Sequence, residues 1–249
     1  MSREPEPAKT ISAFETLLDN HRKRLGISKT EEVWFRGQAN GDHNLSPGLF
    51  RKSMFKRHHE HNMFAQFCTQ GAKFVEKSAD SWEILSTMQH WGAPTRLLDW
   101  TTSLNTALFF ALRNPGPKPT IWIANPYLVN EKSVGKRVMF DAFDHPGYDY
   151  AKQIREEHWP HSAPIAFSIP WTNARIQSQR GYFTVHGSNT EPLNQQSQMA
   201  RKIKKVVIDT GLIPVLRKRL MESGSDPFSL FPDVSGLCET LKWQYSLLD

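Results

Sequence analysis

The run 89–103, QHWGAPTRLLDWTTS, constrains the fold more than any other stretch of the chain. It places charged, hydroxyl and indole side chains between two apolar segments. A segment that only fills a core has no need of this density of polar groups, because an unpartnered buried polar group costs about 1–3 kcal/mol. We therefore expect the run to lie at a site, where its polar atoms meet one another or a ligand.

A second unusual segment is the β-type run 33–38, VWFRGQ, in which Arg36 stands where an apolar residue is expected. One interpretation is that Arg36 pairs with a carboxylate of the chain, for which Asp99 is a candidate. The other is that Arg36 clamps a phosphate or a ribose, because a guanidinium offers a bidentate fork that stays charged. Gly37 would then let the ligand approach the backbone closely.

Length and composition favour one large folded domain. The chain has 249 residues, 39% of them apolar, and eight tryptophans, which is enough for a sizeable core. No apolar run approaches the ~18–20 residues that cross a bilayer, and the polar start carries no signal-peptide region. Cys68 and Cys238 are too few for a disulfide framework. We expect both to be small buried apolar side chains, and we expect a cytoplasmic protein with no membrane partner.

Positive charge is concentrated in the run 201–219. The net charge of the chain is +6, and this run carries seven Lys and Arg side chains against one Asp. Such a patch attracts phosphates and nucleic acid. The alternative is a solvated face that only keeps the protein soluble. A smaller basic cluster, Arg51 and Lys52 with Lys56 and Arg57, lies nearer to the site run.

Periodicity predicts helices and strands mixed along the chain, and hence one α+β domain. The predicted helices are 11–25, 60–77, 81–92, 104–113, 212–221 and 235–243. The predicted strands are 33–36, 120–124, 165–169, 182–186 and 205–208. Ser12 and Glu15 have capping-box spacing at the first helix, and Gly26 suits its end. The polar, aromatic segment 130–162 is interpreted as an insertion.

Several standard sites are poorly supported. His58 and His61 have helical i, i+3 spacing, but no third ligand is indicated, so no metal is expected. Neither standard Gly-rich phosphate loop is present, and there is no Gly-x-Ser-x-Gly elbow. Hydrolases of the serine or cysteine type are therefore disfavoured.

The polar residues of the site run each have two interpretations. Arg96 and Asp99 either pair with each other or contact a ligand. Thr101, Thr102 and Ser103 either cap the helix that follows or hydrogen-bond a sugar. The same choice between a structural and a ligand role applies to Gln89 and His90.

These segments together resemble the FRG domain family, named after the triplet that stands here at 35–37. The family's long central block is similar to 89–101, and its later pieces are similar to 107–111, 179–183 and 229–233. The resemblance spans about residues 30 to 240. It implies an N-terminal helical segment, 1–29, followed by an FRG domain, 30–249, with the insertion at 130–162.

The order of these features is also similar to that of ADP-ribosyltransferases. That resemblance implies a split mixed sheet surrounded by helices, with NAD as the substrate and no metal. A strand Arg, a Ser/Thr trio and a late Glu serve that superfamily, and the matching positions here are Arg36, Thr101–Ser103 and Gln179. The catalytic residues expected are Arg36, Gln179 and Asp99. The residues expected to hold the dinucleotide are Arg36, Gly37, Gln89, His90, Arg96, Thr101, Thr102 and Ser103.

Three functions follow as hypotheses. The first is an NAD-dependent ADP-ribosyltransferase-like enzyme that modifies a macromolecule such as nucleic acid, as a toxin or a phage-defence effector with a neutralising protein partner. The second is a domain of the same fold that binds a nucleotide without chemistry. The third is a nucleic-acid-binding protein that uses the 201–219 patch and whose site run is structural. Gln179 bears on the choice, because an amide orients a hydroxyl but offers no full negative charge to a forming cation.

Overall fold

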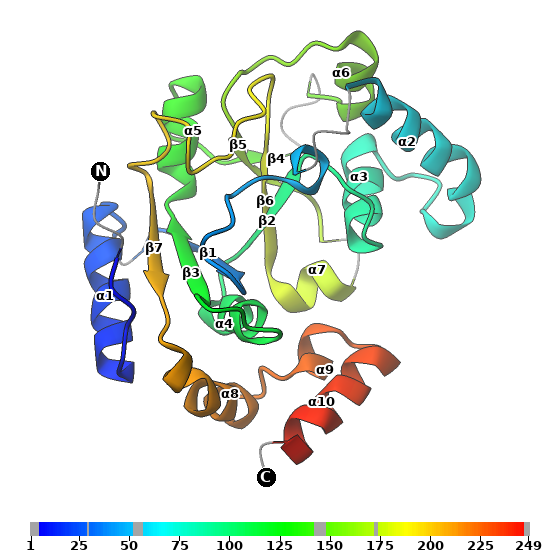
Figure 1. The fold of residues 1–249 in the computed structure, drawn as a ribbon. Coiled ribbons are helices and arrows are strands. Elements are labelled where there is room, and N and C mark those ends of the chain that lie inside the picture. Colours follow the sequence, from blue (N-terminus) through cyan, green and yellow to red (C-terminus); the bar gives the residue numbers. More distant parts are fainter. Residues whose placement is uncertain (1–4, 29, 52–56, 142–147, 172–173, 247–249) are drawn as a thin grey trace.

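The fold is built on one mixed β-sheet with helices around it (Figure 1). In this computed structural model, the described residues are 5–28, 30–51, 57–141, 148–171 and 174–246. In that part of the chain the sheet has seven strands in the order β4-β5-β6-β2-β1-β3-β7, with β4 and β5 parallel and the other neighbours antiparallel. The strands are β1 (Trp34–Gln38), β2 (Leu97–Thr101), β3 (Thr120–Ala124), β4 (Phe140–Asp141), β5 (Ile165–Ser168), β6 (Gly181–Val185) and β7 (Ile203–Val207). The mixed sheet with surrounding helices confirms the predicted α+β fold.

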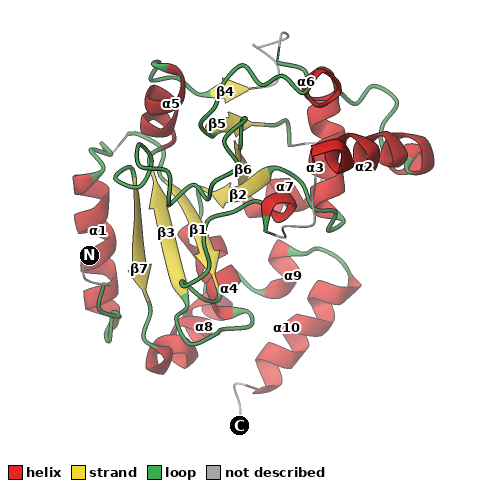
Figure 2. Cartoon of the chain, turned by 45° about the horizontal axis from the view of Figure 1, so that its top comes forward, coloured by secondary structure: helices red, strands yellow, loops and turns green. Residues whose placement is uncertain are grey.

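The pairing between β1 and β2 is the shortest in the described sheet. These two strands are paired at Phe35 and Thr101, whereas β1 pairs with β3, and β2 with β6, over the whole strand length. Figure 2 shows that β1, β3 and β7 run in a different direction from β2 and β6. The sheet therefore opens directly beside Arg36, the residue that follows Phe35.

The helices cover both parts of the sheet. In Figure 1, α1 lies beside β7, while α2, α3 and α6 gather on the side of β4, β5 and β6. The helices are α1 (Ile11–Arg24), α2 (Arg57–Gln70), α3 (Ser81–His90), α4 (Leu104–Leu112), α5 (Pro126–Val134), α6 (Tyr150–Glu156), α7 (Ala174–Gln179), α8 (Ile213–Glu222), α9 (Pro227–Leu230) and α10 (Val234–Ser246). Short 3-10 turns lie at Gly48–Phe50 before α2, at Ala72–Phe74 between α2 and α3, and at Thr210–Leu212 before α8.

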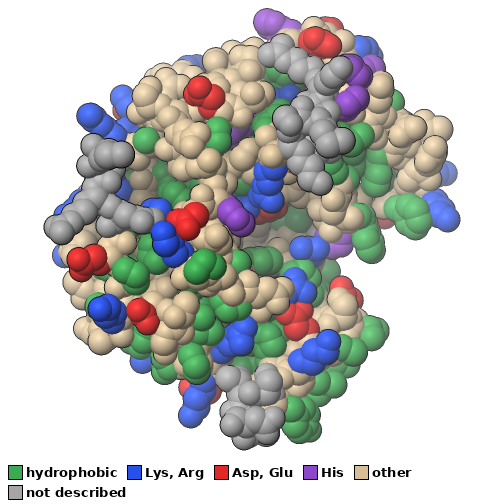
Figure 3. Space-filling view, viewed as in Figure 1, with side chains coloured by type: hydrophobic (Ala, Val, Ile, Leu, Met, Phe, Trp, Pro, Cys, Tyr) green, Lys and Arg blue, Asp and Glu red, His purple; other side chains and the backbone are tan. Residues whose placement is uncertain are grey.

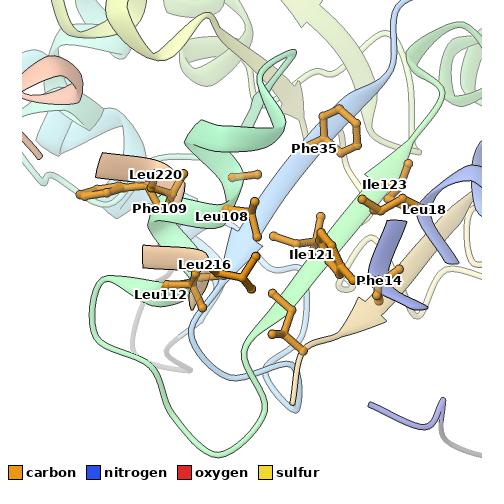
Figure 4. Close-up of a cluster of buried hydrophobic side chains, with 14 of the residues drawn as sticks. Phe14, Leu18, Phe35, Leu108, Phe109, Leu112, Ile121, Ile123, Leu216 and Leu220 are labelled. Carbon is orange, nitrogen blue, oxygen red and sulfur yellow. The ribbon is translucent and has the colours of Figure 1, made fainter. Parts of the chain in front are cut away.

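The largest core cluster joins α1, α4 and α8 to the strands β1, β3 and β7 (Figure 4). Phe14 and Leu18 of α1 pack against the sheet beside Ile121 of β3, and Leu216 of α8 lies beside α4. A residue before the first helix, Ala8, forms a parallel bridge with Ile208, which directly follows β7. The N-terminal segment therefore packs on the same sheet as the site strand β1.

Close packing explains the glycine of the Phe-Arg-Gly triplet. A Cβ atom at Gly37 would lie 1.8 Å from the carbonyl oxygen of Ala107 and 2.7 Å from the amide nitrogen of Ala111, both in α4. No side chain fits there, so Gly37 lets helix α4 lie directly on β1. That packing accounts for the glycine without a ligand, and its predicted role toward a ligand stays a prediction.

Two smaller core clusters support β2 and β6. One lies under α2, α3 and α6 and includes Phe64, Trp82, Tyr150, Phe167 and Val185. The other contains the buried indoles of β1, β2 and β3, together with aliphatic side chains, and includes Trp34, Trp100, Trp122, Leu98 and Met199. Apolar side chains on both faces of β2 are therefore buried in a core cluster, which fixes the position of the strand.

Several local predictions are confirmed and others are wrong. The strand at 120–124 and the helix after Ser103 are confirmed, and Gly26 ends α1 with φ +60°. The cap of α1 is Thr10, whose side chain accepts from the amide of Ala13, so the capping box at Ser12 is wrong. A helix begins two residues earlier than Ser12 suggests because Thr10 has the extended backbone that a cap requires.

The predicted helix 60–77 is too long. Helix α2 ends at Gln70, before Gly71, and Phe74 beyond it is 62% exposed rather than buried on a helical face. Cys68 and Cys238 are both exposed, so the prediction that they are buried apolar side chains is wrong. Both cysteines lie on helices, α2 and α10, and the apolar character of a side chain alone does not say which side of a helix the rest of the chain covers.

The segment 130–162 contains part of α5, the edge strand β4 and helix α6. Tyr150 and Ile154 of α6 are buried in the core under β5 and β6. Residues 142–147 lie outside the described part. The segment thus contributes to the core, and the division of the chain into 1–29, 30–249 and an insertion stays a prediction.

Candidate functional site

A cleft of about 360 Å³ opens at the junction between β1 and β2. Its walls come from β1, the end of α3 and the loop after it, β2, α4, α7 and the start of β6. Figure 3 shows the molecule hollowed in this region, with Lys and Arg side chains near the opening. The predicted site residues that line the cleft are Arg36, Gly37, Gln89, His90, Asp99, Thr101 and Gln179. The predicted residues that do not line it are Arg96, Thr102 and Ser103.

The hydrogen-bond donors of the Arg36 guanidinium are only partly paired with described groups of the protein. Its Nη1 donates to the carbonyl oxygen of Asp99 at 2.7 Å and lies 3.5 Å from Oδ2 of the same residue. The side chain is 14% exposed, and its buried Nε has no hydrogen-bond partner among the described residues. Burial lowers the pKa of the guanidinium, since the charged form is poorly solvated. The predicted pairing with Asp99 is therefore present but weak, and an anion in the cleft would improve the surroundings of Arg36.

Asp99 is held in place by the end of α3. Gln89 donates from Nε2 to Oδ1 of Asp99 at 3.0 Å and to the carbonyl oxygen of Leu97 at 3.3 Å. The hydroxyl of Thr95 donates to the Gln89 side-chain oxygen. The Asp99 side chain itself is 57% exposed. Gln89 thus fixes the direction of a solvent-accessible carboxylate beside Arg36.

Two further arginines line the cleft that the sequence analysis did not assign to the site. Arg51 donates from Nε to the carbonyl oxygen of Ser46 at 2.9 Å. Arg175 of α7 donates from Nη1 to the carbonyl oxygen of His90 at 3.1 Å. Arg36, Arg51 and Arg175 face one lining carboxylate, Asp99, so the described wall of the cleft is positively charged. The basic cluster at 51–57 is the sequence signal for Arg51. The i, i+4 spacing of Arg175 from Gln179 shows only that the two share a helix face, and not that this face lines the cleft.

Hydroxyl and amide groups complete the wall. The Thr101 hydroxyl donates to the carbonyl oxygen of Gln179 at 2.7 Å, and the Gln179 Nε2 donates to that of Leu230 at 3.1 Å. The end of β2 is therefore tied to the end of α7. The Gln179 side-chain oxygen can accept a hydrogen from a ligand hydroxyl.

The other two hydroxyl residues serve local structure. Ser103 is the cap of α4, and its Oγ accepts from the amide of Thr106 at 3.2 Å. The amide of Thr102 donates to the carbonyl oxygen of Arg180 at 3.4 Å. The predicted capping role is therefore confirmed for Ser103. Of the three hydroxyl residues 101–103, the one that lines the cleft is Thr101.

Arg96 is part of a buried ion pair outside the cleft. Its Nε lies 2.5 Å from Oε1 of Glu60, and its Nη2 pairs with the other carboxylate oxygen. The guanidinium also lies 3.5 Å from the ring centre of Trp159 and donates to the carbonyl oxygen of Gly187. The alternative that Arg96 pairs with Asp99 is wrong. Arg96 directly precedes β2 and pairs with Glu60, whereas Asp99, three residues further along the extended chain, points to the opposite face toward Arg36 and Gln89.

His90 stands at the rim of the cleft wall. Burial and the nearby Arg175 lower the pKa of its imidazole, and Asp233 opposes this shift. The neutral form is therefore favoured near neutral pH, in which His90 is suited to hydrogen bonding rather than to binding phosphate by charge.

The basic run 201–219 is not one open surface. Lys205 of β7 lies over the ring of Trp122, while Lys204 is close enough to His21 of α1 to lower the pKa of that histidine. Arg217 donates from Nη2 to the carbonyl oxygen of Leu112 at 2.7 Å, which satisfies the end of α4. Arg219 lies 3.5 Å from Glu15. A role of this run in binding nucleic acid stays a prediction.

The fold and the cleft define the class: an α+β protein whose mixed sheet opens at an arginine-lined site. The FRG domain model matches residues 31–119, which include β1 and the whole run 89–103. The motif-based prediction of an FRG domain is therefore confirmed for this segment. The match leaves Arg175 and Gln179 outside it.

The other comparisons add no relatives. No curated protein and no solved structure matches the chain, so the likeness to ADP-ribosyltransferases stays a prediction. In the described part of the chain, no group of three or more His, Cys, Asp and Glu side chains could hold a metal ion. Nor does any described helix have the length and apolar character to cross a membrane.

Proposed function

We propose that the cleft binds NAD and that the protein transfers ADP-ribose from it to a macromolecule. One observation carries the proposal: Arg36, Thr101 and Gln179 come from three distant segments and line the same cleft. A strand arginine, a hydroxyl at the end of the next strand and a late polar residue are the three features that the motif order assigned to NAD.

The arginines suit the pyrophosphate of the dinucleotide. The buried Nε of Arg36 has no partner among the described residues, and Arg51 is near enough to lower the pKa of the Arg36 guanidinium. Two such neighbouring cations repel each other, and a bound phosphate relieves that repulsion while accepting charge-assisted hydrogen bonds. This arrangement favours a ligand with several negative charges.

The remaining groups suit the ribose that carries nicotinamide. In the proposed transfer the bond between nicotinamide and ribose breaks, nicotinamide leaves with the bonding electron pair, and the acceptor nucleophile bonds to the sugar and loses its proton to solvent. Positive charge develops on the sugar, so a negative group nearby lowers the barrier. Asp99, oriented by Gln89, supplies the carboxylate, while the Gln179 amide orients a ribose hydroxyl.

The test is release of nicotinamide from NAD by the purified protein, measured with matched variants. Arg36→Ala is expected to lower the rate at least about 100-fold, and Asp99→Asn at least tenfold, as for loss of one stabilising group in a transition state. Arg155 is exposed on α6, away from the cleft, and Arg155→Ala is the control that keeps the rate. Equal rates in wild type and Arg36→Ala would refute the proposed chemistry.

A second candidate is a domain that binds the nucleotide without cleaving it. It is favoured by one observation, the amide of Gln179 at the position where the resemblance implies a carboxylate. Binding of NAD that depends on Arg36 without release of nicotinamide would support this candidate. Gln179→Glu is then the informative variant, since it restores the charge and is expected to raise nicotinamide release if only that charge is missing.

The cellular setting is also proposed. An unregulated enzyme that consumes NAD and modifies macromolecules depletes a cofactor that the cell needs. We therefore propose a toxin or phage-defence role in the cytoplasm, with a protein partner that blocks the cleft until it is needed.

A further inference from the structure

Two large indoles stand in solvent at the mouth of the cleft. Trp91 is 71% exposed and Trp171 is 42% exposed, although tryptophan is the side chain that gains most from burial. Trp91 follows α3, and its ring lies edge-on to that of His90, a residue of the cleft wall, at 5.0 Å. Trp171 donates from Nε1 to the carbonyl oxygen of Gly181 at 3.0 Å and packs against Tyr182, both of which line the cleft. Both indoles are therefore fixed beside the opening rather than inside it.

One arginine binds the backbone beside Trp91, and another adjoins in sequence the residue that Trp171 binds. Arg175 donates to the carbonyl oxygen of His90, next to Trp91, and Arg180 directly precedes Gly181, the backbone partner of Trp171. Arg180 is exposed and has the left-handed backbone angle φ 47°, which is uncommon for a residue other than glycine. Asp99 and Asp233 are the carboxylates that act on Arg175, which also lies over the ring of Phe231. Beside Trp171, the Tyr182 hydroxyl donates to the carboxylate of Glu32.

Exposed aromatic rings next to arginines match the chemistry of an unpaired nucleic acid strand. Each base offers a flat π face that stacks on an indole, while its phosphate accepts hydrogen bonds from a guanidinium. A paired strand buries its base faces in its own stack and cannot use the indoles in this way. A peptide would need mostly acidic side chains to satisfy the same arginines, and it offers no regular series of flat rings.

We propose that the mouth of the cleft, at Trp91 with Arg175 and Trp171 with Arg180, binds an unpaired stretch of nucleic acid, which is the acceptor in the transfer. The claim that the strand is the acceptor rests on the proposed function, whereas the claim that the cleft mouth binds the strand does not. Binding at the cleft mouth differs from binding through the 201–219 run because it uses the exposed indoles there, on which bases can stack. The strand would thus be held next to the ribose that Asp99 and Gln179 contact.

The test measures binding of fluorescein-labelled 16-nucleotide oligothymidylate and of a mixed-sequence RNA of the same length, by anisotropy in 50 mM and 150 mM salt. Wild-type protein is expected to bind at least one of the two strands, more weakly at the higher salt and more tightly than the matching duplex. Trp91→Ala and Trp171→Ala are each expected to weaken binding at least about fivefold, since a stacked base contributes about 1–3 kcal/mol. Trp91→Phe keeps a ring and is expected to retain most of the affinity.

Phe74→Ala is the matched control, because Phe74 is also exposed but lies on the 3-10 turn after α2 and not in the cleft wall. Unchanged affinity in both indole variants, tighter binding of duplex, or loss of binding only after neutralising Lys204 and Lys205 would each overturn the inference. Release of nicotinamide is measured in parallel on every variant. Strand binding that depends on the indoles, without any release of nicotinamide, refutes the proposed transfer but supports the binding site. Release of nicotinamide without strand binding supports cleavage of NAD but overturns the binding site.

Discussion

The buried pair of Arg96 and Glu60 gives the sharpest test of which residues in the 89–103 run are structural. Both side chains are nearly inaccessible to solvent, and both guanidinium edges are occupied by the carboxylate and by backbone carbonyl groups. Tyr150 also donates to Glu60 at 2.9 Å. Removing the carboxylate by Glu60→Ala leaves a buried cation and a buried hydroxyl without their partner.

The expected loss of unfolding free energy is about 3–5 kcal/mol, the usual cost of breaking a buried ion pair from one side. For a chain of this size about 2–4 °C of melting temperature corresponds to each kcal/mol, so the melting temperature falls by roughly 6–20 °C. The measurement is urea unfolding followed by tryptophan fluorescence at pH 7, with a thermal melt beside it.

Glu239→Ala is the matched control, because Glu239 makes the same two-point pair with Arg113 but both side chains are more exposed. Its loss is expected to be clearly smaller, since solvent screens the cation that remains. A loss below about 1 kcal/mol in Glu60→Ala would refute the structural role of Arg96. So would a normal melting temperature in Arg96→Ala combined with lost binding of NAD.

Two further predictions concern packing and pH. Gly37→Ala places a Cβ 1.8 Å from the carbonyl oxygen of Ala107, and it is expected to lower the free energy of urea unfolding by about 1–3 kcal/mol. In the control Gly48→Ala the nearest atom to the new Cβ lies at 3.4 Å, so the unfolding free energy is expected to stay unchanged. Equal stability of the two variants would contradict this. Burial lowers the pKa of His161 to about 4 and of His186 to about 3. The unfolded chain, whose histidines have a pKa of about 6.5, therefore binds more protons than the folded chain below that pH. The contribution of these histidines to the unfolding free energy is therefore fully present above that pH and falls as the pH is lowered toward 4, by up to about 1.4 kcal/mol per pH unit for each histidine. His161→Phe is expected to make the unfolding free energy fall less steeply with pH. An unchanged pH profile in this variant would contradict the lowered pKa of His161.

The sequence predicted the elements that carry their own periodicity or caps. The buried strand at 120–124 and the helix after Ser103 were found because apolar runs and a capping hydroxyl are local signals. The end of α2 was missed because Phe74 and Val75 continue the apolar spacing although Gly71 ends the helix. Local spacing does not reveal which aromatic side chains the rest of the chain covers.

The candidate site was partly predictable for the same reason. Arg36 stands out because a cation in an apolar strand needs an explanation, and the density of polar groups at 89–103 marked Asp99 and Gln89. The partner of Arg96 could not be found, since Glu60 lies 36 residues away with no pattern that joins them. Arg175 was missed because its contribution depends on α7 lying across the opening of the sheet, which is a tertiary property.

The most direct test of the central claim is calorimetric titration of NAD into wild-type protein, Arg36→Ala and the Arg155→Ala control. The claim is that the guanidinium beside the β1–β2 junction holds the phosphates of a dinucleotide. Loss of charge-assisted hydrogen bonds is expected to weaken binding about 10-fold to 150-fold in Arg36→Ala, with the control unchanged and both variants folded. Wild-type affinity in a folded Arg36→Ala, or no binding of NAD by the wild-type protein, would contradict it.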